Sequence, residues 1–136
     1  MHLLFVYGTL KDGHGRSAAL ADQRFIGTAK TIDNYVMYNL GSYPGLKKRS
    51  SQSAGKKIIG ELYEVSDECI STLDGIEGVD FGLFAREEII LDEFTITNLP
   101  IFQSTFAKLH RKLAQAYIYL KDTSECKDAG IFWSVR

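Results

Sequence analysis

Short apolar runs separated by polar segments predict a chain built mainly from strands. Residues 3–7 are consecutive apolar and aromatic side chains, a pattern typical of a strand buried on both faces. The segment 83–92 mixes apolar and charged residues and predicts a longer strand with one wet side, which residues 94–96 can continue. The other segments with strand character are 24–31, 34–40, 58–65 and 116–120.

One helix has clear start and stop signals. Ser66 is a favourable N-cap, and the two acidic residues that follow it suit the positive end of a helix. Ile70 and Leu73 lie three residues apart and share a face. We expect Gly75 and Gly78 to break this helix around Ile76 and Glu77.

The remaining segments carry weaker signals. Residues 16–22 predict a short helix, and residues 102–113 have apolar side chains at helical spacing beside a basic face. Residues 41–45 contain proline and glycine and predict an irregular loop, and the polar stretch 47–57 predicts a surface excursion. The apolar residues 130–133 are expected to dock on the body of the protein.

Composition indicates one soluble domain over residues 1–136. The chain has 136 residues, of which 45% are hydrophobic, so it can bury roughly two thirds of the surface that its unfolded form exposes. Its formal net charge of −1 gives no general attraction to nucleic acid or to an anionic membrane. We therefore expect a small-molecule partner.

The cysteines and the N-terminus favour a reducing cytoplasm. Cys69 and Cys126 are isolated, and the first residues lead directly into a strand and not into a signal peptide. No apolar stretch approaches the roughly 20 residues that a membrane-spanning helix needs. The sequence thus predicts a cytoplasmic protein that does not contact a membrane.

Several familiar kinds of site are excluded by their missing residues. The segment 8–13 has the two glycines of a phosphate-binding loop, but His14 stands where that loop needs a lysine. His2, His14 and His110 are too scattered for a zinc-binding HExxH pair, and no GxSxG motif is present. We expect no metal.

Two positions are candidates for chemistry. The backbone amides of Gly8, Thr9 and Leu10, after the first strand, can hold a carboxylate or carbonyl oxygen, or they can belong to an ordinary junction of strand and loop. Glu77 lies between glycines at a predicted helix end, where a glutamate is ordinarily solvated. Its position alone does not make it a general base, which needs geometry and burial.

Three motifs together resemble the gamma-glutamylcyclotransferase-like superfamily, which includes gamma-glutamylamine cyclotransferase. In chain order they are residues 7–10 (Tyr-Gly-Thr-Leu), residues 38–45 and residues 73–78. The resemblance spans roughly residues 3–91, with weaker support from residues 116–119 and Trp133. It implies an α+β fold, a small mixed β-barrel with flanking helices, and a cavity at one barrel end lined by Tyr7, Gly8, Thr9 and Leu10.

The resemblance also implies an activity. Glu77 matches the catalytic glutamate of the family, so it is expected to act as general acid and base. The substrate, a gamma-glutamyl amine or peptide, would form 5-oxoproline and a free amine by attack of its own α-amine, with no cofactor. Amides at residues 8–10 would hold the glutamyl part or its oxyanion, and Tyr43 and Pro44 either exclude water or simply pack a loop.

The chain departs from the family pattern at two places. Members often have a tyrosine where this chain has Phe84, which packs but cannot donate a hydrogen bond, and this places the substrate class in question. Tyr119 either supplies a substitute hydroxyl or is a core tyrosine with a wet tip. The segment 94–115 replaces an expected short turn, and its basic face is either solvated, a cover for the cavity or a partner site.

Three functions remain open at the level of sequence. The first is the cyclotransferase with Glu77 as acid and base, and the second is a non-catalytic module that binds a small acid or peptide end on the same fold. The third is an enzyme that removes a gamma-glutamyl group from a larger biosynthetic product. The leaving amine and the oligomeric state are not encoded in any motif that we recognise.

Overall fold

The computed structural model describes residues 1–8, 17–51, 54–96 and 112–134, and the side chains of 93–96 and 112 are outside this description. The strands are β1 (His2–Val6), β2 (Arg24–Thr31), β3 (Tyr35–Asn39), β4 (Pro44–Lys48), β5 (Ile59–Val65), β6 (Phe84–Ile96), β7 (Lys112–Tyr119) and β8 (Lys127–Asp128). The helices are the α-helix α1 (Asp67–Ile76) and the 3₁₀ turns η1 (Ser17–Leu20) and η2 (Val79–Phe81).

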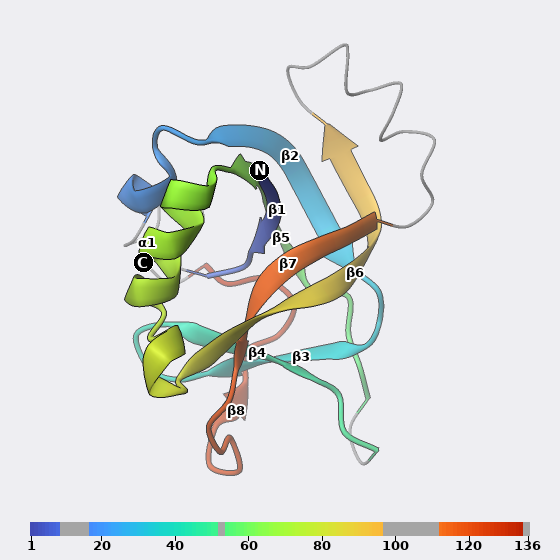
Figure 1. Cartoon of the computed structure of the whole chain (residues 1–136). Coiled ribbons are helices and arrows are strands. Elements are labelled where there is room, and N and C mark those ends of the chain that lie inside the picture. Colours follow the sequence, from blue (N-terminus) through green and yellow to red (C-terminus); the bar gives the residue numbers. More distant parts are fainter. Residues whose placement is uncertain (9–16, 52–53, 97–111, 135–136) are drawn as a thin grey trace.

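The strands form one mixed sheet that closes on itself (Figure 1). Its order is β1-β5-β2-β6-β7-β4-β3-β8, and β1 also pairs with β7 through Leu4 and Gln115. The pairings of β7 with β1 and β4 are parallel, whereas those of β6 with β2 and β7 are antiparallel. The predicted α+β class is confirmed, and the predicted barrel corresponds to this ring of strands.

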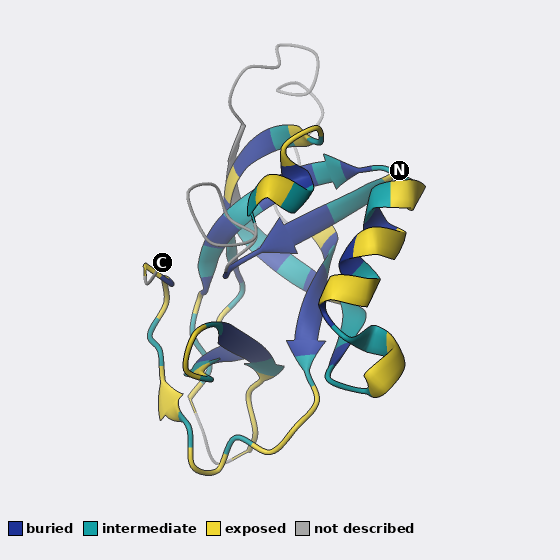
Figure 2. Ribbon diagram, turned by 90° about the vertical axis from the view of Figure 1, so that its left-hand side faces the viewer, coloured by how far each residue is buried: buried dark blue, intermediate teal, exposed yellow. Residues whose placement is uncertain are grey.

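Strand β1 separates two apolar cores, as its unbroken apolar sequence predicts. Phe5 and Tyr7 belong to a core formed by the strands and the C-terminal Trp133. Leu4 and Val6 point the other way and join a core that includes residues of α1. The last three residues of β1 are buried and its first two are half-buried, while buried and exposed residues alternate along α1 (Figure 2).

Helix α1 begins and ends as predicted. The Ser66 hydroxyl accepts a hydrogen bond from the Cys69 N–H at 3.1 Å. Ile70 and Leu73 are buried against the sheet, and each contributes about 1.5–3 kcal/mol of hydrophobic stabilisation. The helix ends at Ile76 with Glu77 as its C-cap, and Gly75 lies within its last turn at a cost of about 1 kcal/mol.

Two predicted irregular regions contain strand structure. Pro44 begins β4, where its missing N–H is tolerated, so the predictions of a loop at 41–45 and an excursion at 47–57 are wrong in part. β4 pairs with β3, and Lys56 forms an isolated bridge to Tyr35.

The helical segments apart from α1 also differ from expectation. The helix predicted at 16–22 is the single turn η1. The helix predicted at 102–113 lies outside the described residues up to 111, and its last two residues belong to β7. No helix in the described part of the chain is long and apolar enough to cross a membrane.

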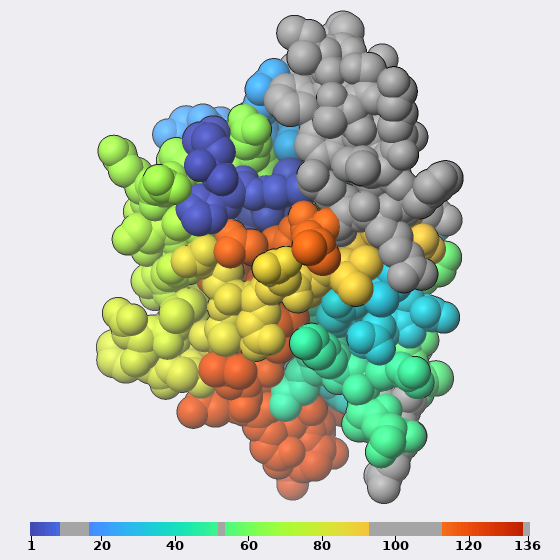
Figure 3. Space-filling view, turned by 45° about the vertical axis from the view of Figure 1, so that its right-hand side comes forward, coloured from blue at the N-terminus to red at the C-terminus, as the bar shows by residue number. Residues whose placement is uncertain are grey.

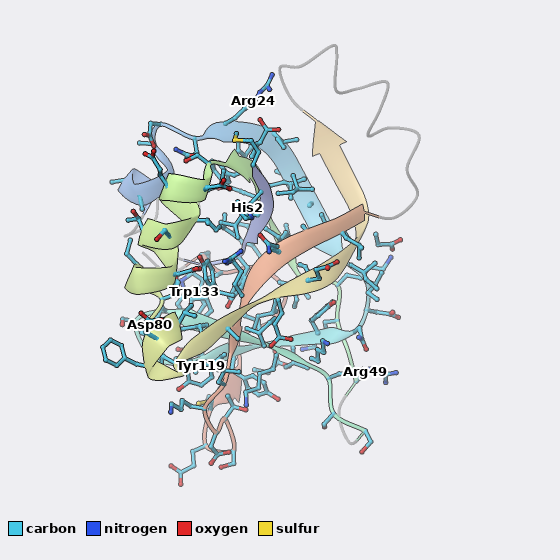
Figure 4. The ribbon with its side chains drawn as sticks, in the orientation of Figure 1. His2, Arg24, Arg49, Asp80, Tyr119 and Trp133 are labelled. Atoms are coloured by element: carbon cyan, nitrogen blue, oxygen red, sulfur yellow. The ribbon has the colours of Figure 1, made fainter. Side chains whose placement is uncertain are left out.

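The C-terminal segment docks on the sheet, as predicted. Trp133 is buried, and the Ile59 N–H donates a hydrogen bond to the Ile131 carbonyl at 2.8 Å. Figure 4 shows the Trp133 side chain among those of the body of the protein.

Candidate active site

A pocket lies where the two apolar cores meet, at the C-terminal end of β1. Its empty space is about 340 Å³, including its opening to solvent. The described residues that line it come from β1, β4, β6, β7, the end of α1 and the turn before β4, and they are Phe5, Val6, Tyr7, Gly8, Tyr43, Pro44, Glu77, Phe84 and Tyr117.

Glu77 reaches this pocket because α1 ends there. It is the C-cap of the helix, and its N–H donates to the Leu73 carbonyl at 2.9 Å. Gly78 then adopts a left-handed conformation, with φ of +64°, and turns the chain into η2. A residue with a side chain is strained at this φ, which explains why glycine follows the glutamate.

The burial of Glu77 sets it apart from the other charged side chains. Glu77 is 8% exposed, and within the described ranges every other Asp, Glu, Lys or Arg side chain is more exposed. Among the described residues that line the pocket, Glu77 alone carries a charge. Because burying a carboxylate is costly, such a group in a cleft is a candidate for function.

Tyr7 lines the pocket with its ring while its hydroxyl is bonded to the backbone. The hydroxyl donates to the Tyr117 carbonyl at 2.5 Å and accepts from the Leu46 N–H at 3.1 Å. Burial, with a smaller contribution from the charge of Glu77, raises the pKa of Tyr7 far above its ordinary value. Tyr7 therefore remains a neutral phenol that joins β1 to β4 and β7.

Gly8 allows the end of β1 to pass close to Pro44. A Cβ atom at Gly8 would lie 2.8 Å from Pro44 Cγ and 2.9 Å from Pro44 Cδ, closer than side-chain carbons approach one another. A side chain at residue 8 would therefore collide with the Pro44 ring. Thr9 and Leu10, the other residues predicted to supply amides, lie outside the described residues.

A row of aromatic rings leads outward from the pocket. Phe84 is buried and packs against Tyr43, with ring centroids 6.3 Å apart, and both line the pocket. Tyr119 packs edge-on against Phe84 at 5.3 Å but is not among the lining residues. Tyr119, which Figure 4 labels, therefore lies outside the described lining of the pocket, and Lys47 Nζ is 5.9 Å from the centre of its ring.

Sequence reasoning missed Tyr117. It lines the pocket, and its hydroxyl donates to Asp74 Oδ1 at 2.7 Å. Burial and this hydrogen bond raise the pKa of Tyr117 far above its ordinary value. Tyr117 and Tyr119 are two residues apart on β7 and share a face. The two-residue period of a strand therefore does not distinguish which of the two tyrosines lines the pocket.

The pocket holds the groups needed for proton transfer in a mostly apolar enclosure. Glu77 can accept or donate a proton, and the rings of Tyr43, Phe84 and Tyr117 line the space beside it. No group of three or more His, Cys, Asp or Glu side chains that could hold a metal ion is found among the described residues.

Comparisons with known proteins agree on a family. A Vibrio cholerae protein named "Putative gamma-glutamylcyclotransferase" is 33% identical over 109 residues, covering 80% of this chain and 88% of its own length. The Escherichia coli K12 gamma-glutamylcyclotransferase family protein YtfP is 31% identical over 86 residues, covering 63% of this chain and 70% of its own.

Solved structures show the same fold at lower sequence identity. An AIG2-like protein from Mus musculus superposes with a TM-score of 0.72 at 21% identity, covering 92% of this chain and 81% of its own. The family model described as "Gamma-glutamyl cyclotransferase, AIG2-like" matches residues 4–132. The chain therefore belongs to the gamma-glutamyl cyclotransferase, AIG2-like family.

Proposed function

We propose that this protein converts a gamma-glutamyl amine or peptide into 5-oxoproline and a free amine or amino acid, with Glu77 as general acid and base. The observation that carries the proposal is the carboxylate of Glu77, 8% exposed, on the wall of a small aromatic pocket. Membership of the family supports the class of reaction. No cofactor is needed, because the nucleophile and the electrophile belong to one substrate molecule.

The first half of the reaction requires a base. The α-ammonium group of the substrate is mostly protonated at neutral pH, since its ordinary pKa is about 8. Glu77 takes one proton from it, and the freed amine attacks the gamma-carbonyl carbon. A carbon–nitrogen bond forms, a five-membered ring closes, and the carbonyl oxygen becomes an oxyanion.

The second half requires an acid. The tetrahedral intermediate collapses, the original amide carbon–nitrogen bond breaks, and Glu77 returns its proton to the departing nitrogen. The amine therefore does not leave as an anion. The ring nitrogen, which carries two hydrogens after the attack, releases one of them as a proton that the freed amine takes up, and no water is consumed. Positioned proton transfer of this kind typically contributes about 10²–10⁴-fold in rate.

The rest of the pocket would bind and orient the substrate. The backbone N–H of Gly8, together with those of Thr9 and Leu10, would hold the glutamyl part or stabilise the oxyanion, and a fixed donor contributes roughly 3 kcal/mol in acyl transfer. The rings of Tyr43 and Phe84 would keep water from the reacting atoms and hold the substrate in a conformation ready to close.

The test is mass-spectrometric detection of 5-oxoproline after incubation with gamma-glutamyl amines, gamma-glutamyl dipeptides and glutathione. We expect the wild type to form the lactam from at least one substrate, and Glu77→Gln to lose at least about 100-fold in rate while keeping its fold. Glu68→Gln is the matched control, because Glu68 is exposed on the same helix. Full activity in Glu77→Gln would refute the role of Glu77.

The same experiment separates the enzyme from a binding module. Phe84 motivates this alternative, because its ring offers no hydroxyl to a substrate. Thermal stabilisation by one of the substrates without any lactam would favour the module and refute the proposed reaction.

A further inference from the structure

A cluster of polar side chains joins the C-terminal turn of α1 to the sheet. Arg86 on β6 donates to both carboxylate oxygens of Asp74 on α1, from Nε at 3.0 Å and from an Nη nitrogen at 3.1 Å. The Tyr117 hydroxyl on β7 donates to the same carboxylate at 2.7 Å. We name these three residues, Asp74, Arg86 and Tyr117, the α1 clamp.

Strand register explains why two side chains reach one carboxylate. Arg86 and Tyr117 are direct partners in the pairing of β6 with β7, so their side chains stand side by side on one face of the sheet. The fork of an arginine matches the two oxygens of a carboxylate and fixes its orientation as well as its distance. The clamp therefore holds Asp74 more rigidly than a single contact would.

The burial of the clamp distinguishes it from the other ion pairs of the described residues. The side chains of Arg86 and Asp74 are 24% and 26% exposed. The pair Lys56 and Asp128, for comparison, has exposures of 39% and 42%. Exposed ion pairs contribute little to stability, whereas partially buried bidentate pairs resist rearrangement more strongly.

The position of Asp74 is poor for helix stability and good for holding the helix end. A carboxylate in the last turn of a helix faces the negative end of the helix dipole, which destabilises the helix. Asp74 precedes Glu77 by three residues, about one turn, so these residues lie near one another at the same end of α1. Arg86 offsets the charge and ties this turn to β6.

The polar contacts continue to the start of α1. Arg86 also donates to Gln115 Oε1 at 3.1 Å, and this oxygen lies 2.9 Å from His2 Nδ1. The other ring nitrogen of His2 lies 2.8 Å from an oxygen of Asp67, the first residue of α1. Because arginine only donates, the Gln115 atom is an oxygen and His2 Nδ1 is the donor.

The figures show the same connection from outside. Figure 4 places His2 between α1 and β7, and Figure 3 shows the N-terminal residues lying between the helix and the start of β7. Both ends of α1 are thus tied through side chains to strands of the ring.

We propose that the α1 clamp positions the carboxylate of Glu77 for proton transfer, so that Asp74 and Arg86 are positioning residues for the reaction. Tyr117 contributes to both the clamp and the pocket wall, and it connects the two directly. A displacement of about 1 Å at a reacting group can cost roughly 100-fold in rate. This inference rests on the proposed function.

The test compares Arg86→Met, which removes the fork and the charge, with Arg86→Lys, which keeps the charge. Lys56→Met is the matched control, since it removes the ion pair with Asp128 outside the pocket. We expect Arg86→Met to lower kcat by about 10- to 100-fold while KM changes less than about threefold. Arg86→Lys should recover part of kcat, and Lys56→Met should match the wild type.

Two further measurements keep the outcomes separate. Hydrogen exchange of the Glu77 and Gly78 amides, which bond to Leu73 and Gly75, should become faster in Arg86→Met. Should that variant fail to fold, Tyr117→Phe removes only one hydroxyl and should lower kcat and speed the same exchange.

Unchanged kcat in a folded Arg86→Met, or a loss that appears only in KM, would overturn the proposal. If the wild type forms no lactam, the proposed function fails, and the exchange measurement alone decides whether the clamp holds the helix end. Unchanged exchange would then overturn the clamp as well.

Discussion

Replacing Tyr7 with phenylalanine removes one oxygen atom from a junction of three strands. That oxygen accepts from the Leu46 N–H of β4 and donates to the Tyr117 carbonyl of β7. The Tyr7 side chain is buried, so water cannot readily replace either bond. The variant keeps the ring and therefore isolates the contribution of the hydroxyl group.

The magnitude follows from the groups that lose a partner. Each buried polar group left without a hydrogen bond costs about 1–3 kcal/mol, so two of them predict a loss of about 2–6 kcal/mol. This is a large fraction of the roughly 5–15 kcal/mol by which a domain is stable. Because burial raises the pKa of Tyr7, the hydroxyl keeps its proton and the loss is independent of pH in the neutral range.

Urea unfolding followed by circular dichroism measures the effect. With a slope of about 2 kcal/mol/M, we expect the midpoint of Tyr7→Phe to fall by roughly 1–3 M with the slope unchanged. Tyr38→Phe is the control, because Tyr38 is a half-buried tyrosine on β3 outside this junction. If Tyr7→Phe is no less stable than Tyr38→Phe, the assigned role of the Tyr7 hydroxyl is wrong.

Three other predictions concern stability. Gly8→Ala places a Cβ 2.8 Å from Pro44 Cγ, so thermal unfolding should show a loss of about 1–3 kcal/mol, and an unchanged melting temperature would contradict the contact. Gly78→Ala is strained at φ of +64° and should cost about 1–2 kcal/mol by the same assay, whereas Gly75→Ala within α1 should not destabilise. Partial burial raises the pKa of Asp128, but the Lys56 and Gly130 hydrogen bonds and the Lys56 charge outweigh it, so the pKa is lowered. Asp128 therefore stabilises the fold above the unfolded-state pKa of about 3.9, and this contribution is lost as pH falls through the lower folded-state value. The free energy of unfolding, measured as pH is lowered, should fall less steeply in Asp128→Asn than in the wild type. Identical curves for the two proteins would argue against the ion pair between Asp128 and Lys56.

Local signals predicted the elements that depend on local chemistry. The unbroken apolar run of β1 indicated burial on both faces, and the structure divides its side chains between two cores. The N-cap Ser66 and the spacing of Ile70 and Leu73 predicted the start and the buried face of α1. These features need only neighbours along the chain, which a single sequence displays.

Features that depend on distant strands were not predicted. Pro44 indicated a loop, but its position at the first residue of β4 follows from pairing with β3. Tyr117 was missed in favour of Tyr119 because strand period treats them alike, and only the depth of each along β7 separates them. A fork between Arg86 and Asp74 has no periodic signature at all.

The candidate site therefore combines one local feature with several distant ones. A glutamate followed by a left-handed glycine can be read from the sequence, but its burial depends on strands that come both before and after it in the chain. The hydroxyl of Tyr7, the residue after β1, donates to the backbone carbonyl of Tyr117 on β7. The hydroxyl of Tyr117 in turn donates to the carboxylate of Asp74 on α1. Through these two tyrosines, the strand that closes the ring also connects to the helix that carries Glu77.

Loss of the Tyr7 hydroxyl should consequently weaken the attachment of α1 as well as the sheet. Faster hydrogen exchange of the Glu77 amide in Tyr7→Phe is the measurement that tests this link. Unchanged exchange in a destabilised variant would show that the two contacts act independently.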